Sequence, residues 1–240
     1  MPIRQPLSLA VTRPEIDARG LAAALIQRGH RVVMAPLLEI VPRAGVALAH
    51  AAYQAIAVTS ANGPRCLGRV VVQKLDLNTP VFAVGTQSCV AAKALGFHHV
   101  TALGGDVDGM LAHLRATLKP ADGVILYLSG AETSGDLEGQ LHAAGFGVDR
   151  VISYDAKALR LDDKREALAS CDGVLLYSPR TAKLWQAETA RLDLDISAKI
   201  HFCLSSRVAQ ALPPNTHISI ASAPQDAALL ALLDLAGEAE

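Results

Sequence analysis

The chain has 240 residues, of which 51% are hydrophobic and 19% charged, and its formal net charge is −1. That much apolar material fills one large core or two small ones, and so little charge excludes a disordered chain. The balance lacks the basic surplus that neutralises nucleic-acid phosphates, so we expect no nucleic-acid partner.

We expect neither a secretory signal nor a membrane span. The opening residues Met1 to Pro6 lack the apolar core and cleavage site of a secretory signal, and no apolar run reaches the length of a membrane span. We therefore expect a cytoplasmic protein. The four cysteines are scattered without a CxxC pair and are predicted to be reduced, buried small hydrophobes, namely Cys66, Cys89, Cys171 and Cys203.

Strand-like and helical patterns alternate along most of the chain. Strands are predicted over residues 7–11, 31–34, 55–58, 81–84, 100–102, 124–128, 147–154, 174–177, 202–204 and 218–221. After the first strand, Leu21, Leu25 and Ile26 indicate a helix that ends at Gly29. Further helices are predicted over 64–72, 88–95, 109–118, 136–144, 163–169, 181–190, 207–212 and 227–236. This alternation predicts an α/β fold with parallel sheets covered by helices on both faces.

Six of the strand-like runs end abruptly in a small, hydroxylated or glycine-containing turn. The six are 7–11, 55–58, 81–84, 124–128, 174–177 and 202–204, and a helical pattern follows each turn. Such a junction places backbone N–H groups and the positive end of a helix dipole at the carboxyl end of a strand, which suits an anion. Parallel sheets bind their ligands at the same edge. The repetition indicates one polyanionic ligand held at many points.

Two extended segments, 36–42 and 151–159, interrupt the alternation. If they pair as a two-stranded connector, the middle of the chain is a domain inserted into an outer one. The residues alone leave this arrangement open beside a single continuous sheet.

Eight short motifs follow one another in a characteristic order. They read LAVTRP at 9–14, RGH at 28–30, APLLEI at 35–40, VTSAN at 58–62, FAVG at 82–85, LYLSG at 126–130, VISY at 151–154 and LYSP at 176–179. In this order and spacing the chain resembles the uroporphyrinogen-III synthase family over nearly its whole length.

The resemblance implies both a fold and a reaction. The fold would be two α/β lobes, an outer one of residues 1–36 with 160–240 and an inserted one of residues 43–150, joined by linker strands at 37–42 and 151–159. The reaction would be that of a cyclising lyase of haem and other tetrapyrrole biosynthesis. It converts linear hydroxymethylbilane, which bears eight carboxylates, into uroporphyrinogen III with loss of water and inversion of the last pyrrole ring. The family binds its substrate between the lobes and uses no metal or organic cofactor, and we expect a monomer.

The resemblance also places Tyr154 where the family has a tyrosine that faces the substrate. A phenol there could hydrogen-bond the leaving hydroxyl and assist its departure. The alternative is a packed ring with a solvated tip.

The remaining candidates are substrate-binding residues at the strand-to-helix junctions. Ser60 and Ser178 align with paired hydroxylated turns of the family, but each could simply cap a helix. Arg13 could bind a carboxylate through its fork or lie solvated in a first helical turn. The full set is Thr12, Arg13, Thr59, Ser60, Asn62, Gly85, Thr86, Ser88, Gly130, Ser178 and Ser206.

Three points remain: a possible metal site, a departure from the family pattern and an alternative function. The adjacent His98 and His99 would point to opposite faces of a strand, so we expect no metal site there. Ser205 and Val208 stand where the family has glycine and a small hydroxylated residue, which leaves open either compensation by neighbouring hydroxyls or a weaker contact. A non-catalytic two-lobed binder of an anionic small molecule remains the alternative function.

Overall fold

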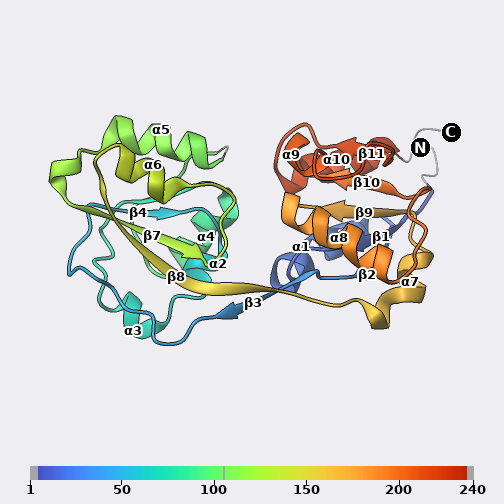
Figure 1. Ribbon diagram of the computed structural model, residues 1–240, viewed down its shortest axis with the longest axis horizontal. Helices are drawn as coiled ribbons and strands as arrows, with labels where there is room; N and C mark the ends of the chain where they lie inside the picture. The colour runs from blue at the N-terminus through green and yellow to red at the C-terminus, as the bar shows by residue number, and fades with distance from the viewer. Residues whose placement is uncertain (1–4, 105, 237–240) are drawn as a thin grey trace. The chain divides into compact units, whose positions relative to one another are not determined.

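The computed structural model describes residues 5–104 and 106–236, which form two α/β units. Unit 1 is drawn from Met1–Glu39 and Lys157–Glu240, and unit 2 from Ile40–Ala156. The chain therefore leaves unit 1 once and returns to it once (Figure 1).

Unit 1 contains a five-stranded parallel sheet in the order β11-β10-β9-β1-β2. Its strands are β1 (Ser8–Val11), β2 (Arg31–Met34), β9 (Gly173–Leu176), β10 (Ile200–Cys203) and β11 (Ile218–Ile220). Every residue of β1 and β9 is buried, as expected of strands that are covered on both faces. The chain winds outward from β1 to β2 and later from β9 to β11, so the strand order reverses between β1 and β9.

Helices cover both faces of this sheet. One face packs Leu9, Val11 and Phe202 against α1 (Glu15–Gln27) and α10 (Asp226–Ala236). The other packs Val174 and Leu176 against α7 (Arg165–Ala169), α8 (Pro179–Arg191) and α9 (Ser206–Ala209). Such double coverage is typical of doubly wound sheets.

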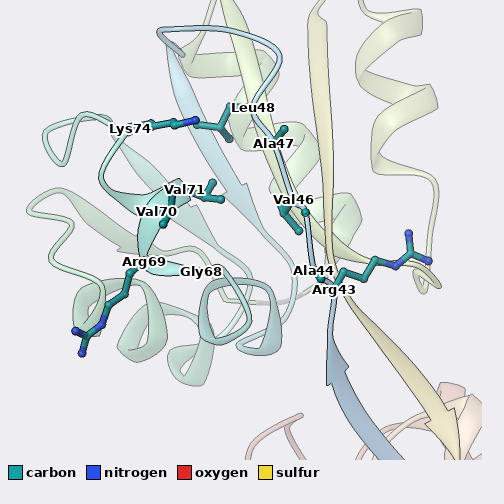
Figure 2. Close-up of a pocket in the computed structure, with 11 residues that line it drawn as sticks. Arg43, Ala44, Val46, Ala47, Leu48, Gly68, Arg69, Val70, Val71 and Lys74 are labelled. Atoms are coloured by element: carbon teal, nitrogen blue, oxygen red, sulfur yellow. The ribbon is translucent and has the colours of Figure 1, made fainter.

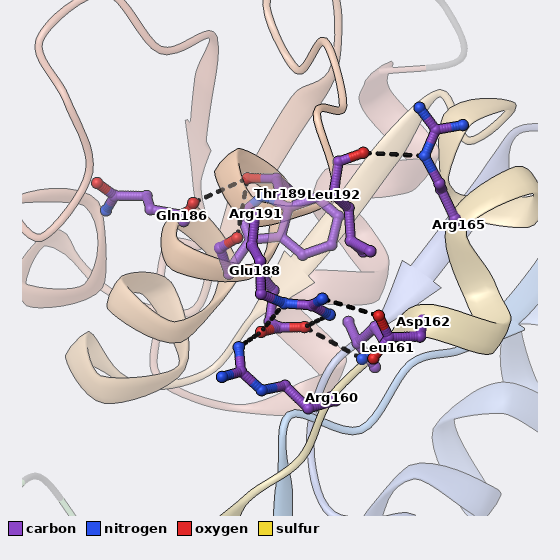
Figure 3. A network of polar contacts seen from close by, with 10 residues as sticks. Arg160, Leu161, Asp162, Arg165, Gln186, Glu188, Thr189, Arg191 and Leu192 are labelled. Carbon is purple, nitrogen blue, oxygen red and sulfur yellow. Dashed lines mark hydrogen bonds and ion pairs between the residues drawn. The ribbon is translucent and has the colours of Figure 1, made fainter.

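A buried carboxylate holds α8 against the segment that follows β8 (Figure 3). Glu188 is 4% exposed and accepts hydrogen bonds from Arg160 at 2.6 Å and from the backbone N–H of Leu161 at 3.1 Å. Arg191 donates to the same carboxylate from both Nε and Nη2, at 3.0 and 2.8 Å, and to Asp162 in η2 (Asp162–Lys164) at 2.7 Å. The hydrogen bond from Arg191, followed by that from Arg160, lowers the pKa of Glu188 to about 2.

Unit 2 contains a six-stranded sheet in the order β3-β8-β7-β4-β5-β6. The strands are β3 (Leu38–Pro42), β4 (Ala55–Val58), β5 (Val81–Ala83), β6 (Val100–Ala102), β7 (Val124–Gly130) and β8 (Gly147–Ala158). Strands β4 to β8 run parallel, and their order reverses between β4 and β7.

This sheet too is covered on both faces. Ile56, Val58 and Leu128 pack with α3 (Arg69–Val72) and α4 (Thr86–Ala94). Gly63 in α2 (Asn62–Arg65) lies against Leu128. On the other face Ile125 and Tyr127 pack with α5 (Val107–Thr117) and α6 (Leu137–Ala143), which lie together at the top of unit 2 in Figure 1. The short helix η1 (Pro120–Asp122) precedes β7.

The predicted fold class is confirmed, because both sheets are mostly parallel and helices flank each. The glycine stop predicted at Gly29 is confirmed, since Gly29 has a φ of +87°. Gly96 and Gly145, which follow α4 and α6, have φ of +101° and +87°. The left-handed backbone there admits glycine at little cost and ends the preceding helix.

Three predicted elements are wrong in detail. The helix expected over 64–72 is two single turns, α2 and α3, because Gly68 takes an extended backbone between them. The strand expected to end at residue 128 continues through Gly130, and the next helix begins only at Leu137. No helix therefore follows that turn directly. Residues 147–158 form one strand rather than a strand followed by a separate extended segment.

Within residues 5–104 and 106–236, no helix has the length and apolar character needed to cross a membrane. All four cysteines are free. Cys89, Cys171 and Cys203 are buried as predicted, whereas the prediction is wrong for Cys66, which is only partly buried.

Candidate functional site

Each sheet has one point where neighbouring strands leave in opposite directions, and ligands of open α/β sheets bind beside such points at the carboxyl ends of the strands. In unit 1 this point lies between β1 and β9, and in unit 2 between β4 and β7. Most of the predicted site residues lie at these two places, and we describe each place by itself.

In unit 1, Thr12 and Arg13 follow β1 but are engaged within the protein. The Thr12 hydroxyl is fully buried and donates to the carbonyl of Leu175 in β9 at 2.7 Å. The Arg13 guanidinium binds both carboxylate oxygens of Asp226 at 2.9 and 3.0 Å and lies 4.5 Å from the centre of the Tyr177 ring. Both hydrogen bonds come from Nη1, so one nitrogen of Arg13 is already engaged with a carboxylate of the chain itself.

Tyr177, which follows β9, lies beside Arg13. Its phenolic oxygen is buried and has no hydrogen-bond partner among the described residues. Burial raises the pKa of the phenol well above its usual value. A buried hydroxyl without a hydrogen-bond partner lowers the stability of the folded state, so packing of the ring alone does not explain a tyrosine here.

Ser178 caps α8. Its hydroxyl accepts from the Thr181 N–H at 3.1 Å, and the Thr181 hydroxyl accepts from the Ser178 N–H at 3.0 Å. Ser206 is exposed at the start of α9, a helix of one turn that offers only a weak dipole. The capping role considered for Ser178 is thus present, and its hydroxyl is not free.

In unit 2, the turn after β4 carries Thr59, Ser60 and Asn62. The Thr59 hydroxyl lies 3.2 Å from the phenolic oxygen of Tyr127 in β7, so it joins the two strands that flank the reversal point. The Ser60 hydroxyl accepts from the Asn62 N–H at 3.3 Å, and Asn62 is 8% exposed. This is a local turn contact, since the N-cap position of α2 is Ala61 and no side chain caps this helix.

Gly85, Thr86 and Ser88 lie one strand further out, at the start of α4. Thr86 is exposed and Ser88 is 5% exposed. An added Cβ on Gly85 would meet nothing within 4 Å, so space does not require glycine there. The structure therefore places these three beside the reversal point rather than at it.

Gly130, the last residue of β7, lies in direct contact with Tyr154, which lies within β8 four residues before its end. A Cβ added to Gly130 would lie 2.6 Å from Cζ of Tyr154 and 2.9 Å from its hydroxyl oxygen, so only glycine admits the ring in this position. The backbone carbonyl of Tyr154 accepts from the Ala131 N–H at 3.0 Å. Tyr154 is 8% exposed, which makes it a packed side chain beside the reversal point of unit 2.

Sequence reasoning missed Arg150, which contacts this corner most extensively. Its guanidinium donates from Nε to the Ser129 hydroxyl at 2.9 Å and from Nη2 to the carbonyls of Gly130 and Ala131, each at 3.0 Å. Nη1 lies 3.3 Å from the carboxylate of Glu138 in α6. The available signal was weak, an arginine before the apolar pair Val151 and Ile152 in a strand that also carries Asp149 and Ser153.

A separate hollow of about 390 Å³ lies in unit 2 between α3 and the segment after β3. Figure 2 shows its apolar wall from Val46, Leu48 and Val71, with the Lys74 side chain extending toward Leu48 and that of Arg69 pointing away. None of the predicted site residues lines it. Among residues 5–104 and 106–236 no cluster of three or more His, Cys, Asp or Glu side chains is arranged to hold a metal ion.

Comparison with known proteins identifies relatives with the same fold. The family model described as Uroporphyrinogen-III synthase HemD matches residues 19–231. The crystal structure of uroporphyrinogen-III synthetase from Helicobacter pylori aligns with a TM-score of 0.63 at 17% identity, over 96% of this chain and 100% of that one. A mutant uroporphyrinogen III synthase from Thermus thermophilus aligns with a TM-score of 0.56 at 15% identity, over 98% and 100%. No curated protein sequence matches significantly.

Proposed function

The chain belongs to the uroporphyrinogen-III synthase family, a family of cyclising lyases in tetrapyrrole biosynthesis, and on that premise we propose that it converts hydroxymethylbilane into uroporphyrinogen III. In this reaction the terminal hydroxyl leaves, the last pyrrole ring is inverted and the macrocycle closes. The observation that carries the assignment to particular residues is the contact of Tyr154 with Gly130 beside the reversal point of unit 2.

We propose that the substrate carboxylates are held mainly by backbone N–H groups of the turns after β1, β4, β5 and β9. Three internal contacts support a larger share for the backbone than for the side chains. The hydroxyls of Thr12 and Ser178 already bond within the protein, and Nη1 of Arg13 already binds Asp226. A flexible ligand with eight carboxylates suits many modest contacts from both units, and each turn holds its N–H groups in place before the ligand arrives.

We propose that the Tyr154 phenol donates a hydrogen bond to the departing hydroxyl of the substrate. A phenol is neutral near pH 7 and retains its proton, so it can assist a leaving oxygen without first being charged. The low exposure of Tyr154 supports this role, because a donor shielded from water interacts more strongly with developing charge. The same burial also fits simple packing, and rate measurements separate the two roles.

The variant Tyr154→Phe tests the assignment because it keeps the ring and removes only the hydroxyl. Loss of a positioned acid should lower kcat about 10²–10⁴-fold, whereas loss of one ordinary hydrogen bond to the substrate costs about 1 kcal/mol, or less than tenfold. We expect the larger loss, with the uninverted isomer accumulating. Tyr53→Phe is the matched control, because its phenol bonds to Asp149 and lies before β4, at the opposite end of that strand from Thr59. A Tyr154→Phe enzyme within tenfold of the wild type would return Tyr154 to packing.

The alternative is a protein that binds an anionic small molecule without turning it over. The internally satisfied hydroxyls of Thr12 and Ser178 favour neither function, since backbone N–H groups serve a binder equally well. The product distinguishes the two, because a binder leaves hydroxymethylbilane to cyclise without inversion. As part of the same proposal, the enzyme acts in the cytoplasm and is a monomer. Gel filtration of the purified protein would test the oligomeric state.

A further inference from the structure

We propose that Arg150 is a positioning residue for Tyr154, acting through the backbone of residues 129–131. This inference rests on the proposed function, in which Tyr154 assists the departing hydroxyl. It concerns a side chain that the sequence motifs did not single out. Arg150 lies in β8 opposite Tyr127 of β7, four residues before Tyr154 in the same strand.

The first step of the argument is the unusual backbone at the end of β7. Ser129 pairs with Ile152, but Gly130 pairs with Tyr154, so the register shifts between these two pairs and leaves Ser153 as an extra residue. Such irregularities bend a strand and redirect the side chains beside them. The shift brings the Tyr154 ring over Gly130 instead of alongside a side chain in the next pair.

The second step is that this irregular backbone is held from both sides by side chains. Arg150 donates to the Ser129 hydroxyl and to the carbonyls of Gly130 and Ala131, at 2.9, 3.0 and 3.0 Å. The Ser153 hydroxyl lies 3.3 Å from the Ser129 carbonyl and 2.9 Å from that of Gly63. Hydrogen bonds from a charged donor are the stronger of these. The Arg150 side chain is 23% exposed, so water competes only in part.

The third step connects this backbone to the phenol. A Cβ on Gly130 would overlap Cζ, Cε2 and the hydroxyl oxygen of Tyr154, at 2.6, 2.8 and 2.9 Å. The surface on which the hydroxyl end of the ring rests is therefore the Gly130 backbone itself. Any movement of residues 129–131 moves that surface, and a displacement of about 1 Å at a reacting group can lower a rate about 100-fold.

Arginine suits this task better than lysine. The hydrogen bonds of Arg150 to residues 129–131 come from two separate nitrogens, Nε and Nη2, held in one plane, whereas the three donors of an ammonium all come from one nitrogen. Arg150→Lys should therefore keep the charge beside Glu138 and lose part of the positioning. We expect an intermediate kcat for Arg150→Lys, between those of the wild type and Arg150→Gln.

The decisive experiment is a double-mutant cycle of Arg150→Gln and Tyr154→Phe, measured as kcat and KM for uroporphyrinogen III formation. With Tyr154 present, Arg150→Gln should lower kcat about 10- to 100-fold with little change in KM. With Phe at position 154 the same substitution should change kcat less than about twofold, since residues that act as a unit are not additive. Equal losses in both backgrounds would show that Arg150 does not act through Tyr154.

Gly130→Ala provides a second perturbation that leaves every hydrogen bond of Arg150 in place. The added methyl group should displace the ring and reproduce the loss in kcat even if Arg150→Gln fails to fold. Gly20→Ala is the control, since an added Cβ there meets nothing within 4 Å and lies in the exposed part of α1. A Gly130→Ala enzyme with wild-type kcat would show that the activity does not depend on the contact between the Tyr154 ring and the Gly130 backbone.

A spectroscopic measurement separates failure of this inference from failure of the proposed function. The four tyrosines can be labelled with ¹³C in the ring, and the signal of Tyr154 identified by its loss in Tyr154→Phe. Arg150→Gln should shift the Tyr154 signal and leave that of Tyr177, in unit 1, unchanged. If the wild type makes no uroporphyrinogen III but the signal shifts, the function fails and the positioning stands. If the enzyme is active and the Tyr154 signal does not move, the positioning role is wrong.

Discussion

Replacing Glu188 by Gln should destabilise unit 1 by an amount that depends on pH. The carboxylate accepts hydrogen bonds from Arg160, Arg191 and the Leu161 N–H, and its pKa falls from 4.5 to about 2. A difference of about 2.5 in pKa corresponds to about 3 kcal/mol of stability. Solvent screens part of this, since the side chain of Arg160 is 69% exposed. We therefore expect Glu188→Gln to lower the free energy of unfolding by about 1–2 kcal/mol at pH 7.

The pH dependence follows from the direction of the shift. A carboxylate whose pKa is lowered in the folded state stabilises that state above its unfolded pKa of 4.5 and loses this contribution as pH falls toward about 2. The difference between wild type and Glu188→Gln should therefore be constant above about pH 5.5 and shrink steadily below pH 4.5.

The natural assay is urea unfolding followed by tryptophan fluorescence. The chain has a single tryptophan, Trp185, which is fully buried in the same helix as Glu188. Glu15→Gln is the matched control, because it removes an ion pair with Arg19 in which both side chains are exposed, and should cost less than about 0.5 kcal/mol. Identical unfolding curves for wild type and Glu188→Gln at pH 7 would refute the reasoning. So would a difference that persists unchanged at pH 3.

Three further outcomes follow from single contacts. Ser60→Ala should lower kcat/KM less than about tenfold, because its hydroxyl makes one local contact and backbone groups carry the binding; complete loss of activity in a folded variant would argue against distributed contacts. Gly173→Ala should destabilise unit 1 by about 1–3 kcal/mol in the same fluorescence assay. The reason is that the new Cβ would lie 2.8 Å from the Phe202 ring and 2.9 Å from the Ile200 carbonyl, and a stability equal to wild type would contradict this overlap. His201 accepts a hydrogen bond from the indole N–H of Trp185, and burial lowers the pKa of His201 below 6.5. The urea midpoint should therefore fall as pH drops below 6.5, and it should vary less in His201→Asn. A midpoint independent of pH between about 7 and 5.5 would be inconsistent with this.

The strands and their order of appearance were predictable because their signals are local. Buried strands such as β4 and β9 read as short runs of apolar residues, and Gly29, Gly96 and Gly145 end helices by their backbone freedom. The end of β7 was not predictable from its own residues. Ser129-Gly130 reads as a turn, but pairing with β8 and the hydrogen bonds of Arg150 keep these residues extended.

The partners of the candidate site residues were beyond the reach of sequence patterns because they lie far apart in the chain. Arg13 and Asp226 are separated by 213 positions, and Thr12 bonds to a carbonyl 163 positions away. Nothing in the LAVTRP motif indicates that both side chains are already engaged. Arg150 was missed for the same reason, since its role depends on Ser129 and Gly130, about 20 positions earlier, being brought beside it by the parallel pairing of β7 and β8.

The central claim is that this chain directs the cyclisation of hydroxymethylbilane to the inverted product. The most direct measurement incubates hydroxymethylbilane with and without the purified protein, oxidises the products and separates the porphyrin isomers by chromatography. The account predicts that the III isomer dominates with the protein present and that the uninverted isomer forms without it. Formation of the uninverted isomer alone, at the same rate in both incubations, would contradict the claim and leave the protein as a binder.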